Sequence, residues 1–235
     1  MSTRWIGPLW GAVVLGVITA APAAADQALS FNLGLFALQG EDGRSEEDVL
    51  RQNLTFLRFD IGDLNGAALG ADWLIGLGPW FEGSVGAGFH RGTASSTYAE
   101  FVNEDGSEIR QELKLRVVPI SASVRVFPLG RDRALQPYVG AGVAILPWRY
   151  SETGDFVNFA TFEIFRDSFV DSGTAVGPEG LFGLRYRMTD SWGAGGELRV
   201  RGGTADLDPD PDLGFAGTEL DLGGYTTTFT LQYHF

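Results

Sequence analysis

The last eleven residues of the chain alternate between two kinds of side chain with a period of two. The odd positions carry the apolar and aromatic series Tyr225, Thr227, Phe229, Leu231, Tyr233 and Phe235. The even positions between them are mainly Thr, with Gln232 and His234 at the end. Because successive side chains of a strand point to opposite faces, this segment predicts a strand with one apolar face and one polar face. Such a face needs either a packed core or lipid against it.

The same alternation recurs along the chain and predicts eight strands. They cover about residues 29–38, 67–77, 81–91, 111–127, 136–148, 176–187, 192–201 and 225–235. The fourth of them contains Pro119, which has no N–H to donate to a neighbouring strand. We therefore expect a bulge or another irregularity at that point.

The connections between the predicted strands alternate in length. Short turns fall at residues 78–79, 130–135 and 189–191, whereas the long segments are residues 40–66, 92–110, 150–175 and 202–223. This pattern predicts an all-β fold, an eight-stranded antiparallel up-and-down transmembrane β-barrel with short periplasmic turns and long extracellular loops. Closure removes every sheet edge, as lipid requires. The alternative is a soluble sandwich, but nothing in the sequence indicates a second sheet.

The first residues have the composition of a secretory signal peptide. Arg4 supplies a positive charge, residues 5–21 are mostly apolar, and Ala23 and Ala25 form a small-residue cleavage site before Asp26. A membrane-anchoring helix is the alternative, but the Ala-x-Ala end favours cleavage.

This leaves residues 1–25 as a cleaved signal peptide and residues 26–235 as one outer-membrane β-barrel domain. The net charge of −13 argues against a nucleic-acid partner, whose phosphates need Lys and Arg. The chain has no Cys, which excludes disulfides and thiolate metal sites.

If the apolar faces meet lipid, the opposite faces fill the lumen. The charged residues on those faces are Asp72, Glu82, Arg125, Arg185, Arg187, Glu197, Arg199 and Arg201. Buried charges must be paired, so we expect a network in which Glu82 and Glu197 bridge several Arg side chains. Such a network is either a structural plug or a gated polar pathway.

Several aromatic residues lie near predicted strand ends, where the membrane interfaces are expected. They are Trp73, Trp80, Tyr138, Trp148, Tyr186, Trp192 and Tyr233. This position is typical of the aromatic girdles of membrane barrels. For Trp80 and Tyr138, ordinary packing is the alternative.

The long segments carry most of the acidic residues. The last of them contains Asp206, Asp208, Asp210, Asp212, Glu219 and Asp221. The spacing of the first three is that of a calcium loop, but prolines interrupt it, and the Gly and Glu that such a loop requires are missing. We therefore expect no specific metal site and no cofactor. Loose association of divalent cations with the acidic loops, close to lipopolysaccharide, is a hypothesis.

Two long segments contain apolar side chains as well. Residues 45–60 predict either a short amphipathic helix over the barrel mouth or an extra hairpin. The third long segment carries Phe156, Phe159, Phe162, Phe165 and Phe169. These side chains either pack against one another, which we favour, or form an exposed surface for a ligand or lipid.

Catalytic candidates are few. The chain has only His90 and His234, and Ser95 and Ser96 follow the first of them without a nucleophile motif. A Ser–His–acid site built on His90 is therefore a minor alternative. We expect that the protein is not an enzyme.

Two segments carry a resemblance to a known family. Residues 136–143 read QPYVGAGV, and residues 231–235 read LQYHF. With the signal peptide and the strand pattern, they make the chain resemble the small outer-membrane barrels grouped with the OmpA, OmpX and OmpW transmembrane domains. Unlike OmpA, the sequence has no C-terminal peptidoglycan-binding domain, and it has no basic adhesive loop.

The resemblance implies export through the periplasm to the bacterial outer membrane, with its lipid and lipopolysaccharide as surroundings. It also implies insertion by the barrel-assembly machinery, for which the terminal strand is the signal through Phe229, Leu231, Tyr233 and Phe235. The expected role is structural or one of surface interaction. The alternatives are OmpW-like passage of small or hydrophobic molecules, which would leave sideways between strands, and a lipid A-modifying enzyme.

Overall fold

The computed structural model describes residues 26–207 and 214–235. The predicted cleavage residues Ala23 and Ala25 lie outside these ranges, whereas Asp26 lies inside. No helix in the described ranges is long and apolar enough to cross a membrane.

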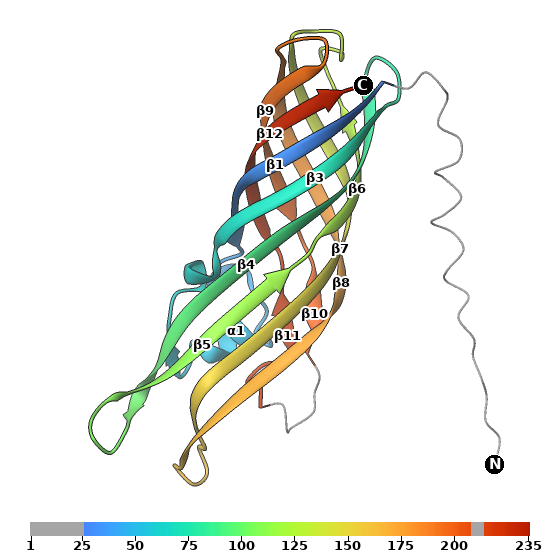
Figure 1. Cartoon of the computed structure of the whole chain (residues 1–235). Helices are drawn as coiled ribbons and strands as arrows, with labels where there is room; N and C mark the ends of the chain where they lie inside the picture. The colour runs from blue at the N-terminus through green and yellow to red at the C-terminus, as the bar shows by residue number, and fades with distance from the viewer. Residues whose placement is uncertain (1–25, 208–213) are drawn as a thin grey trace, which may run out of the picture.

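The strands form one closed antiparallel ring (Figure 1). In ring order they are β1 (Gln27–Leu38), β3 (Gly66–Gly76), β4 (Phe81–Val102), β5 (Glu108–Val117) with β6 (Ile120–Val126), β7 (Leu135–Val157), β8 (Ile164–Arg187), β9 (Trp192–Arg201) and β12 (Gly224–His234). β12 pairs with β1 from Ala28↔His234 to Leu38↔Gly224 and so closes the ring. β5 and β6 lie end to end as one strand of the wall, so the predicted eight-stranded barrel is confirmed.

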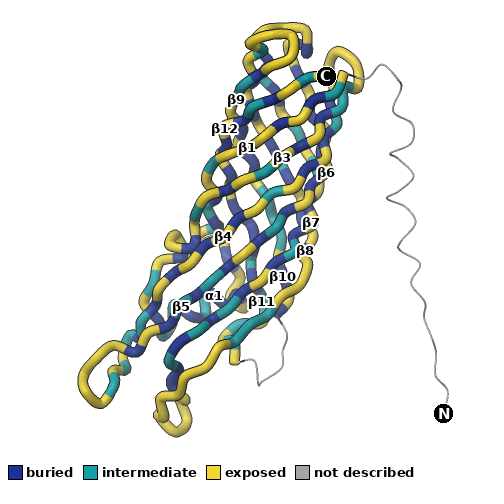
Figure 2. Tube along the Cα trace, viewed as in Figure 1, coloured by how far each residue is buried: buried dark blue, intermediate teal, exposed yellow. Residues whose placement is uncertain are grey.

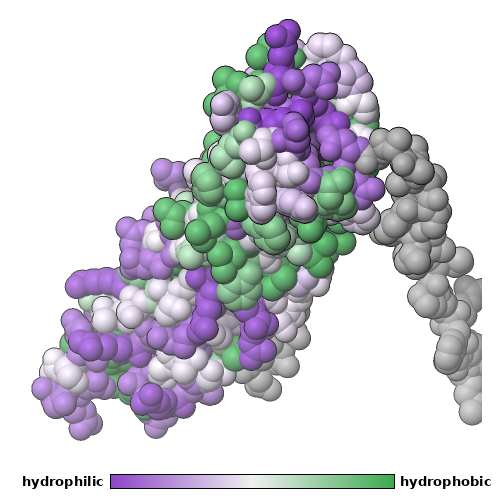
Figure 3. Space-filling model, turned by 45° about the horizontal axis from the view of Figure 1, so that its top comes forward, coloured by the Kyte–Doolittle hydropathy of each residue, from purple (hydrophilic) through white to green (hydrophobic). Residues whose placement is uncertain are grey.

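Burial alternates residue by residue along most of the membrane-spanning wall (Figure 2). The exposed face is apolar. Phe31 and Leu33 of β1 are 52% and 59% exposed, whereas Ser30, which precedes Phe31 in the same strand, is buried. The exposed apolar side chains of residues 29–35, 69–77, 81–89, 120–126, 139–145, 176–186, 192–200 and 225–233 are called the apolar belt below. Figure 3 shows it as a hydrophobic zone between hydrophilic ends. This belt is the membrane-spanning part of the wall.

The periplasmic end has short turns. At the β3–β4 turn, Gly78 has a φ of +95°, which favours glycine. The C-terminus lies at this end, where the Phe235 N–H donates to the carbonyl of Gln27 at 3.0 Å.

Two of the predicted long loops are instead mostly strand. β4 continues to Val102 and β5 begins at Glu108, so most of residues 92–110 extends the wall. β7 and β8 likewise pair without a register shift from Leu135↔Tyr186 to Val157↔Ile164. The physical reason is that these segments are rich in Thr, Val, Phe and Tyr, which have high β-propensity, although many of their outward positions are polar. The wall therefore extends well beyond the apolar belt.

The irregularity at Pro119 is present without a bulge. The strand assignment breaks between Val117 and Ile120, but the pairs His90↔Val117 and Ala87↔Ile120 keep the same register. The Gly88 N–H still donates to the Pro119 carbonyl at 2.8 Å. Only the missing proline N–H interrupts the ladder.

The described parts of the first and last long segments fold inside the outer mouth of the barrel. They form η2 (Glu41–Gly43), α1 (Val49–Asn53), β2 (Leu57–Arg58), η3 (Ile61–Leu64), β10 (Thr204–Asp206) and β11 (Glu219–Asp221). Residues 45–60 thus contain the predicted short helix but no hairpin, since β2 is a two-residue strand that pairs with Thr97 and Tyr98 of β4. Their apolar side chains share one core with the inner wall. We call this assembly the mouth plug.

Candidate functional site: the charged lumen

Glu82 is the centre of the charges near the periplasmic end. β4 points it into the lumen, where it is buried. Both arms of the Arg185 guanidinium donate to its two oxygens at 2.8 and 2.9 Å. Arg125 Nη1 lies 3.3 Å from Oε1, and Arg131 Nη2 lies 3.6 Å from Oε2. One carboxylate therefore faces guanidinium groups of three arginines.

Arg125 connects this group to the next carboxylates. Its Nη2 lies 3.1 Å from Glu197 and 3.7 Å from Asp72, and its guanidinium stands 5.2 Å from the centre of the Tyr138 ring. The Tyr138 hydroxyl donates to Glu197 at 2.8 Å. Gly183 makes room for this ring, because a Cβ there would lie 2.2 Å from the Tyr138 side chain.

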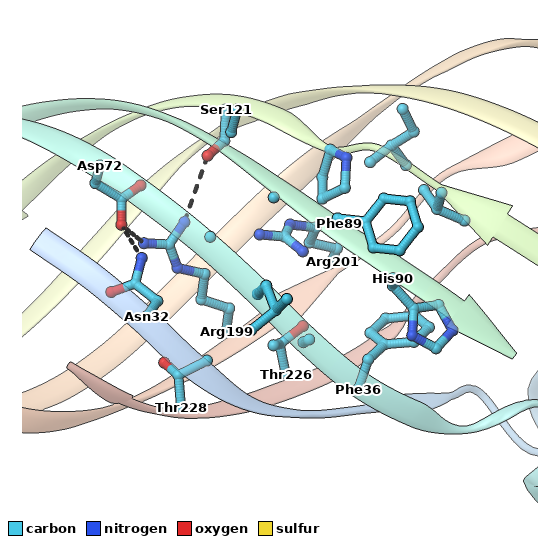
Figure 4. Close-up of a pocket in the computed structure, with 18 of the residues that line it drawn as sticks. Asn32, Phe36, Asp72, Phe89, His90, Ser121, Arg199, Arg201, Thr226 and Thr228 are labelled. Carbon is cyan, nitrogen blue, oxygen red and sulfur yellow. Dashed lines mark hydrogen bonds and ion pairs between the residues drawn. The ribbon is translucent and has the colours of Figure 1, made fainter.

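Arg199 is the centre of a second group, nearer the outer end. It pairs with Asp72 (Figure 4). It also pairs with Glu197 and lies 3.7 Å from Glu179. Arg201 Nε donates to the same Glu179 at 2.6 Å. Asn32 donates to Asp72 at 2.7 Å. The two groups form one continuous network, because Asp72 and Glu197 each contact both Arg125 and Arg199.

The structure brings together almost all of the charges assigned to the lumen from sequence. The exception is Arg187, which pairs with no carboxylate among the described residues and donates instead to the Arg131 carbonyl at 2.8 Å. Sequence reasoning missed Glu179 and Arg131. Glu179 lies in phase with Arg185 on β8, so the alternation would have found it. Arg131 lies in a turn, where no alternation exists.

The network fills the lumen with paired charges. Charge-assisted hydrogen bonds offset the desolvation of groups that are almost fully buried, and removing one partner leaves the other charge uncompensated. Some donors are left over: the Nε atoms of Arg125 and Arg185 have no hydrogen-bond partner among the described residues. The interior of an eight-stranded barrel is just wide enough for its own side chains, and these charged side chains occupy that interior here.

A cavity of about 50 Å³ separates the network from the mouth plug. Asp72 and Arg199 line it on one side and Phe36 and His90 on the other (Figure 4). The His90 ring packs on Phe36 with their centroids 4.2 Å apart, and neither ring nitrogen has a hydrogen-bond partner among the described residues. Ser96 donates to the Gln111 carbonyl at 3.3 Å instead, so the serine is not positioned by His90.

The mouth plug has its own buried polar centre. Asp48 accepts hydrogen bonds from the backbone of Leu50 and Arg51 and pairs with Arg44 at 2.8 Å. Deeper in the plug, Glu152 accepts from Asn53 at 2.6 Å and from the Tyr150 hydroxyl at 2.8 Å. Burial raises the pKa of this Glu152 carboxyl, which lies outside the membrane-spanning segments, although both hydrogen bonds act in the opposite direction.

The predicted girdle is partly wrong. Trp73, Trp80 and Trp192 are exposed on the outer surface, as are Tyr186 and Tyr233. Tyr138 and Trp148 are instead buried inside the barrel. Both occupy even positions of β7, whose even positions face inward, so the strand phase overrides their placement near strand ends.

The aromatic side chains of the third long segment are partly packed and partly exposed, and only some of the acidic residues of the last segment lie in the described ranges. Phe156 packs on Phe165 and Phe169, with ring centroids 5.8 and 4.6 Å apart, whereas Phe159 and Phe162 are exposed at the β7–β8 tip. Among the acidic residues, Asp208, Asp210 and Asp212 lie outside the described ranges. Within those ranges, no group of three or more His, Asp or Glu side chains is placed to hold a metal ion.

The terminal strand presents its aromatic face to the outside. Phe229, Tyr233 and Phe235 are exposed and Leu231 is half-buried. The Tyr233 ring contacts Trp192 of β9 at 5.0 Å between centroids. Its role as an assembly signal remains a prediction.

A closed ring of strands, an apolar exterior and a lumen of buried charges together define an integral outer-membrane β-barrel. The sequence matches the family model described as "Outer membrane protein beta-barrel domain" over residues 10–235, and the chain belongs to this family. Its location is the bacterial outer membrane. No curated protein matches the sequence.

The chain is similar to solved structures of small outer-membrane barrels, and the first of these shows the shared fold. The outer membrane protein OprG from Pseudomonas aeruginosa is 12% identical, with 90% of this chain and 96% of that chain covered and a TM-score of 0.55. Neisserial surface protein A is 10% identical, with 89% and 97% covered and a TM-score of 0.48. Outer membrane protein W of E. coli is 14% identical, with 91% and 100% covered and a TM-score of 0.42.

Proposed function

We propose that the protein is a closed outer-membrane barrel with a surface-interaction role, and that its lumen is plugged at rest. The observation that carries this proposal is the double closure of the interior. The Asp72–Glu82–Arg125–Glu197 network occupies the membrane-spanning part, and the mouth plug fills the outer part with an apolar core. Ions moving along this axis would have to separate buried ion pairs and then cross apolar packing.

The extended hairpins support the surface role. The tips of β4–β5 and β7–β8 carry exposed apolar side chains beyond the membrane, including Val102, Phe159 and Phe162. Phe101 packs on Phe159 with their centroids 5.8 Å apart, so the two tips hold one another in place. Exposed aromatic groups on a rigid support are typical of contact surfaces.

Conductance in a planar bilayer tests the plug. We expect no ion-sized opening for the wild-type barrel, and openings for Glu82→Ala, which removes the carboxylate shared by three arginines. The control is Glu108→Ala, because Glu108 forms an exposed ion pair with Arg110 on the hairpin. Stable ion-sized openings of the wild type at rest would overturn the plugged barrel.

The surface role is tested separately with Phe159→Ser/Phe162→Ser. Cells that display the wild-type barrel are compared with cells that display this variant for sedimentation by cell–cell contact. We expect slower sedimentation of the variant at equal surface display. Equal sedimentation would contradict a role of the hairpin tips.

A second candidate function is passage of small or hydrophobic molecules through the wall. It is favoured by the lining of the cavity, which includes lipid-facing Leu69 and Phe89 beside the paired glycines Gly70 and Gly88. The wall is thin there because glycines have no side chains. Uptake of an apolar dye into proteoliposomes checks this candidate: faster uptake with wild type than with Gly88→Leu supports it, and equal uptake removes it.

The proposal includes no catalytic role. Its support is geometric: His90 lies against Phe36, and Ser96 bonds to the backbone. Mass analysis of lipid A from cells with the wild type, with His90→Ala and without the protein tests this point. We expect identical profiles, and a modification that depends on His90 would contradict the proposal.

A further inference from the structure

Three arginines lie side by side on the outer surface of the barrel. Arg91 of β4 is the register partner of Arg116 of β5, which is in turn the partner of Arg149 of β7. All three side chains are exposed and alternate with buried neighbours, so they point away from the lumen. Directly opposite side chains on neighbouring strands have Cβ atoms about 5 Å apart. We call these three residues the arginine row.

The arginine row has no counter-charge in the protein. None of its guanidinium groups makes an ion pair or a side-chain hydrogen bond with another described residue. Like charges directly opposite one another destabilise a sheet. This arrangement stands in a chain with 30 acidic and only 17 basic residues, where acidic partners are abundant. The lumen shows the contrast, since its arginines are almost all paired with carboxylates.

The residues next to the arginine row add further groups that can donate hydrogen bonds to an anion. The next outward positions are Thr93, Lys114 and Ser151, which form a second register row beyond it. The arginine row, Lys114 and Ser151 line a surface hollow of about 270 Å³, and Phe89 lines it as well. Lys114 pairs with Glu112 at its outer side, so this pair bounds the hollow. Guanidinium and hydroxyl groups around a hollow suit a phosphate, which accepts bidentate hydrogen bonds from Arg.

The depth of the hollow indicates where the phosphate comes from. Two residues before Arg91, the exposed ring of Phe89 is part of the apolar belt, and Ile120 and Ile145 continue the belt on the neighbouring strands. Two residues of a strand span about 7 Å, so the arginine row lies just beyond the acyl chains. It faces the extracellular side, where headgroups of the outer leaflet lie. A lipid with a phosphorylated headgroup places its acyl chains on Phe89 and its phosphate on the arginines.

We propose that the arginine row binds the phosphate groups of lipid A in the outer leaflet. This site is on the outside of the wall, and the proposal does not depend on whether the lumen conducts. It rests on the location in the outer membrane and on the unpaired charge, the hollow and the depth of these residues.

Titration of lipid A onto the full barrel in detergent micelles tests the proposal. Binding is followed by native mass spectrometry for the wild type and for Arg91→Gln/Arg116→Gln/Arg149→Gln. We expect the triple variant to bind at least about tenfold more weakly, because each lost arginine removes charge-assisted hydrogen bonds. The matched control is Arg110→Gln/Arg133→Gln/Arg166→Gln, which removes the same charge from exposed positions elsewhere and is expected to bind as the wild type does.

Two further arms distinguish the source of the phosphate. Chemically dephosphorylated lipid A is expected to bind the wild type and the triple variant equally weakly. Inorganic phosphate at millimolar concentration is expected not to displace lipid A. Displacement would mean a free-phosphate site and overturn the lipid proposal, as would equal binding of lipid A to the wild type and a triple variant that keeps its strand content by circular dichroism.

Discussion

Glu82 and Arg185 form a two-pronged ion pair across the lumen, although they lie on non-adjacent strands, β4 and β8. Hydrogen bonds of the wall connect only neighbouring strands. This pair connects opposite sides of the ring, and Arg125 extends the connection to Glu197 of β9. The lumen charges therefore connect strands that are not neighbours in the sheet, and they also occupy the interior of the barrel.

Removing the central carboxylate is expected to destabilise the barrel strongly. In Glu82→Ala, Arg185 loses the only carboxylate it contacts among the described residues, and Arg125 loses one of three. Breaking a buried pair from one side costs about 3–5 kcal/mol. Urea unfolding in detergent, followed by loss of the heat-modifiable form on gels, measures this change.

The matched control for that experiment is Glu108→Ala. Its pair with Arg110 is exposed, and such pairs contribute about 0–1 kcal/mol. An equal loss of stability in both variants would contradict a bracing role of the lumen network.

The mouth plug is expected to open without loss of the barrel in Asp48→Ala. Asp48 caps α1, pairs with Arg44 and accepts the Asp221 N–H at 2.7 Å, so it joins the first and last plug segments. Loss of a helix cap alone costs about 1 kcal/mol, and the buried pair adds to it. Hydrogen exchange should accelerate in the plug and stay slow in β1 and β12.

Asp60→Ala is the control for the plug. Asp60 also caps a short helix, η3, but it is exposed and makes no ion pair among the described residues. It should change exchange only around η3. Barrel strands that exchange as fast as the plug in Asp48→Ala would show that the two do not open independently.

The stability of the mouth plug is expected to fall as the pH rises. Burial raises the pKa of Glu152 above its ordinary value of 4.5, so the fold favours the protonated carboxyl. This contribution is complete below pH 4.5 and is lost as the pH rises through the higher folded-state pKa. Glu152→Gln keeps the acceptor for Asn53 and Tyr150 but cannot ionise. Hydrogen exchange of α1 in this variant should lose that pH dependence, and an unchanged dependence would point to another group.

Deletion of Phe235 is expected to reduce membrane insertion while export stays intact. The side chain is 66% exposed and ends the aromatic face of β12, which the assembly machinery is predicted to read. Phe162→Ala is the control, because that ring is 67% exposed but lies at the opposite end of the molecule. Fractionation and heat-modifiability measure insertion. Normal insertion without Phe235 would contradict its role.

The strand phase was the part of the structure that sequence predicted best. Period-two alternation is a local property, and it holds where one face meets lipid and the other meets packed side chains. It predicts that Asp72, Glu82 and Arg125 lie inside, and all three are buried there. The same rule, applied consistently, would have added Glu179 and moved Tyr138 and Trp148 inside.

The parts that sequence did not predict depend on contacts distant along the chain. The outward positions of the hairpin extensions are polar because they meet water instead of lipid, so residues 92–110 and 150–175 resemble loops in sequence. Arg131 reaches the network from a turn, and no periodicity marks a turn residue. The fold of the mouth plug depends on the joining of Asp48 to Asp221, which are 173 residues apart.

The continuous pairing of β7 with β8 also determines how far this hairpin extends beyond the membrane. From Arg149 to Val157 the strand advances about 26 Å at 3.3 Å per residue, close to the thickness of the hydrocarbon core itself. The hairpin thus continues the barrel wall outward. Its tilt and rigidity determine the distance of Phe159 and Phe162 from the membrane surface. Shortening both strands by equal, even numbers of residues would reduce that distance and keep the inward and outward faces. The reach of this protein beyond its own membrane is therefore an adjustable dimension of the barrel wall.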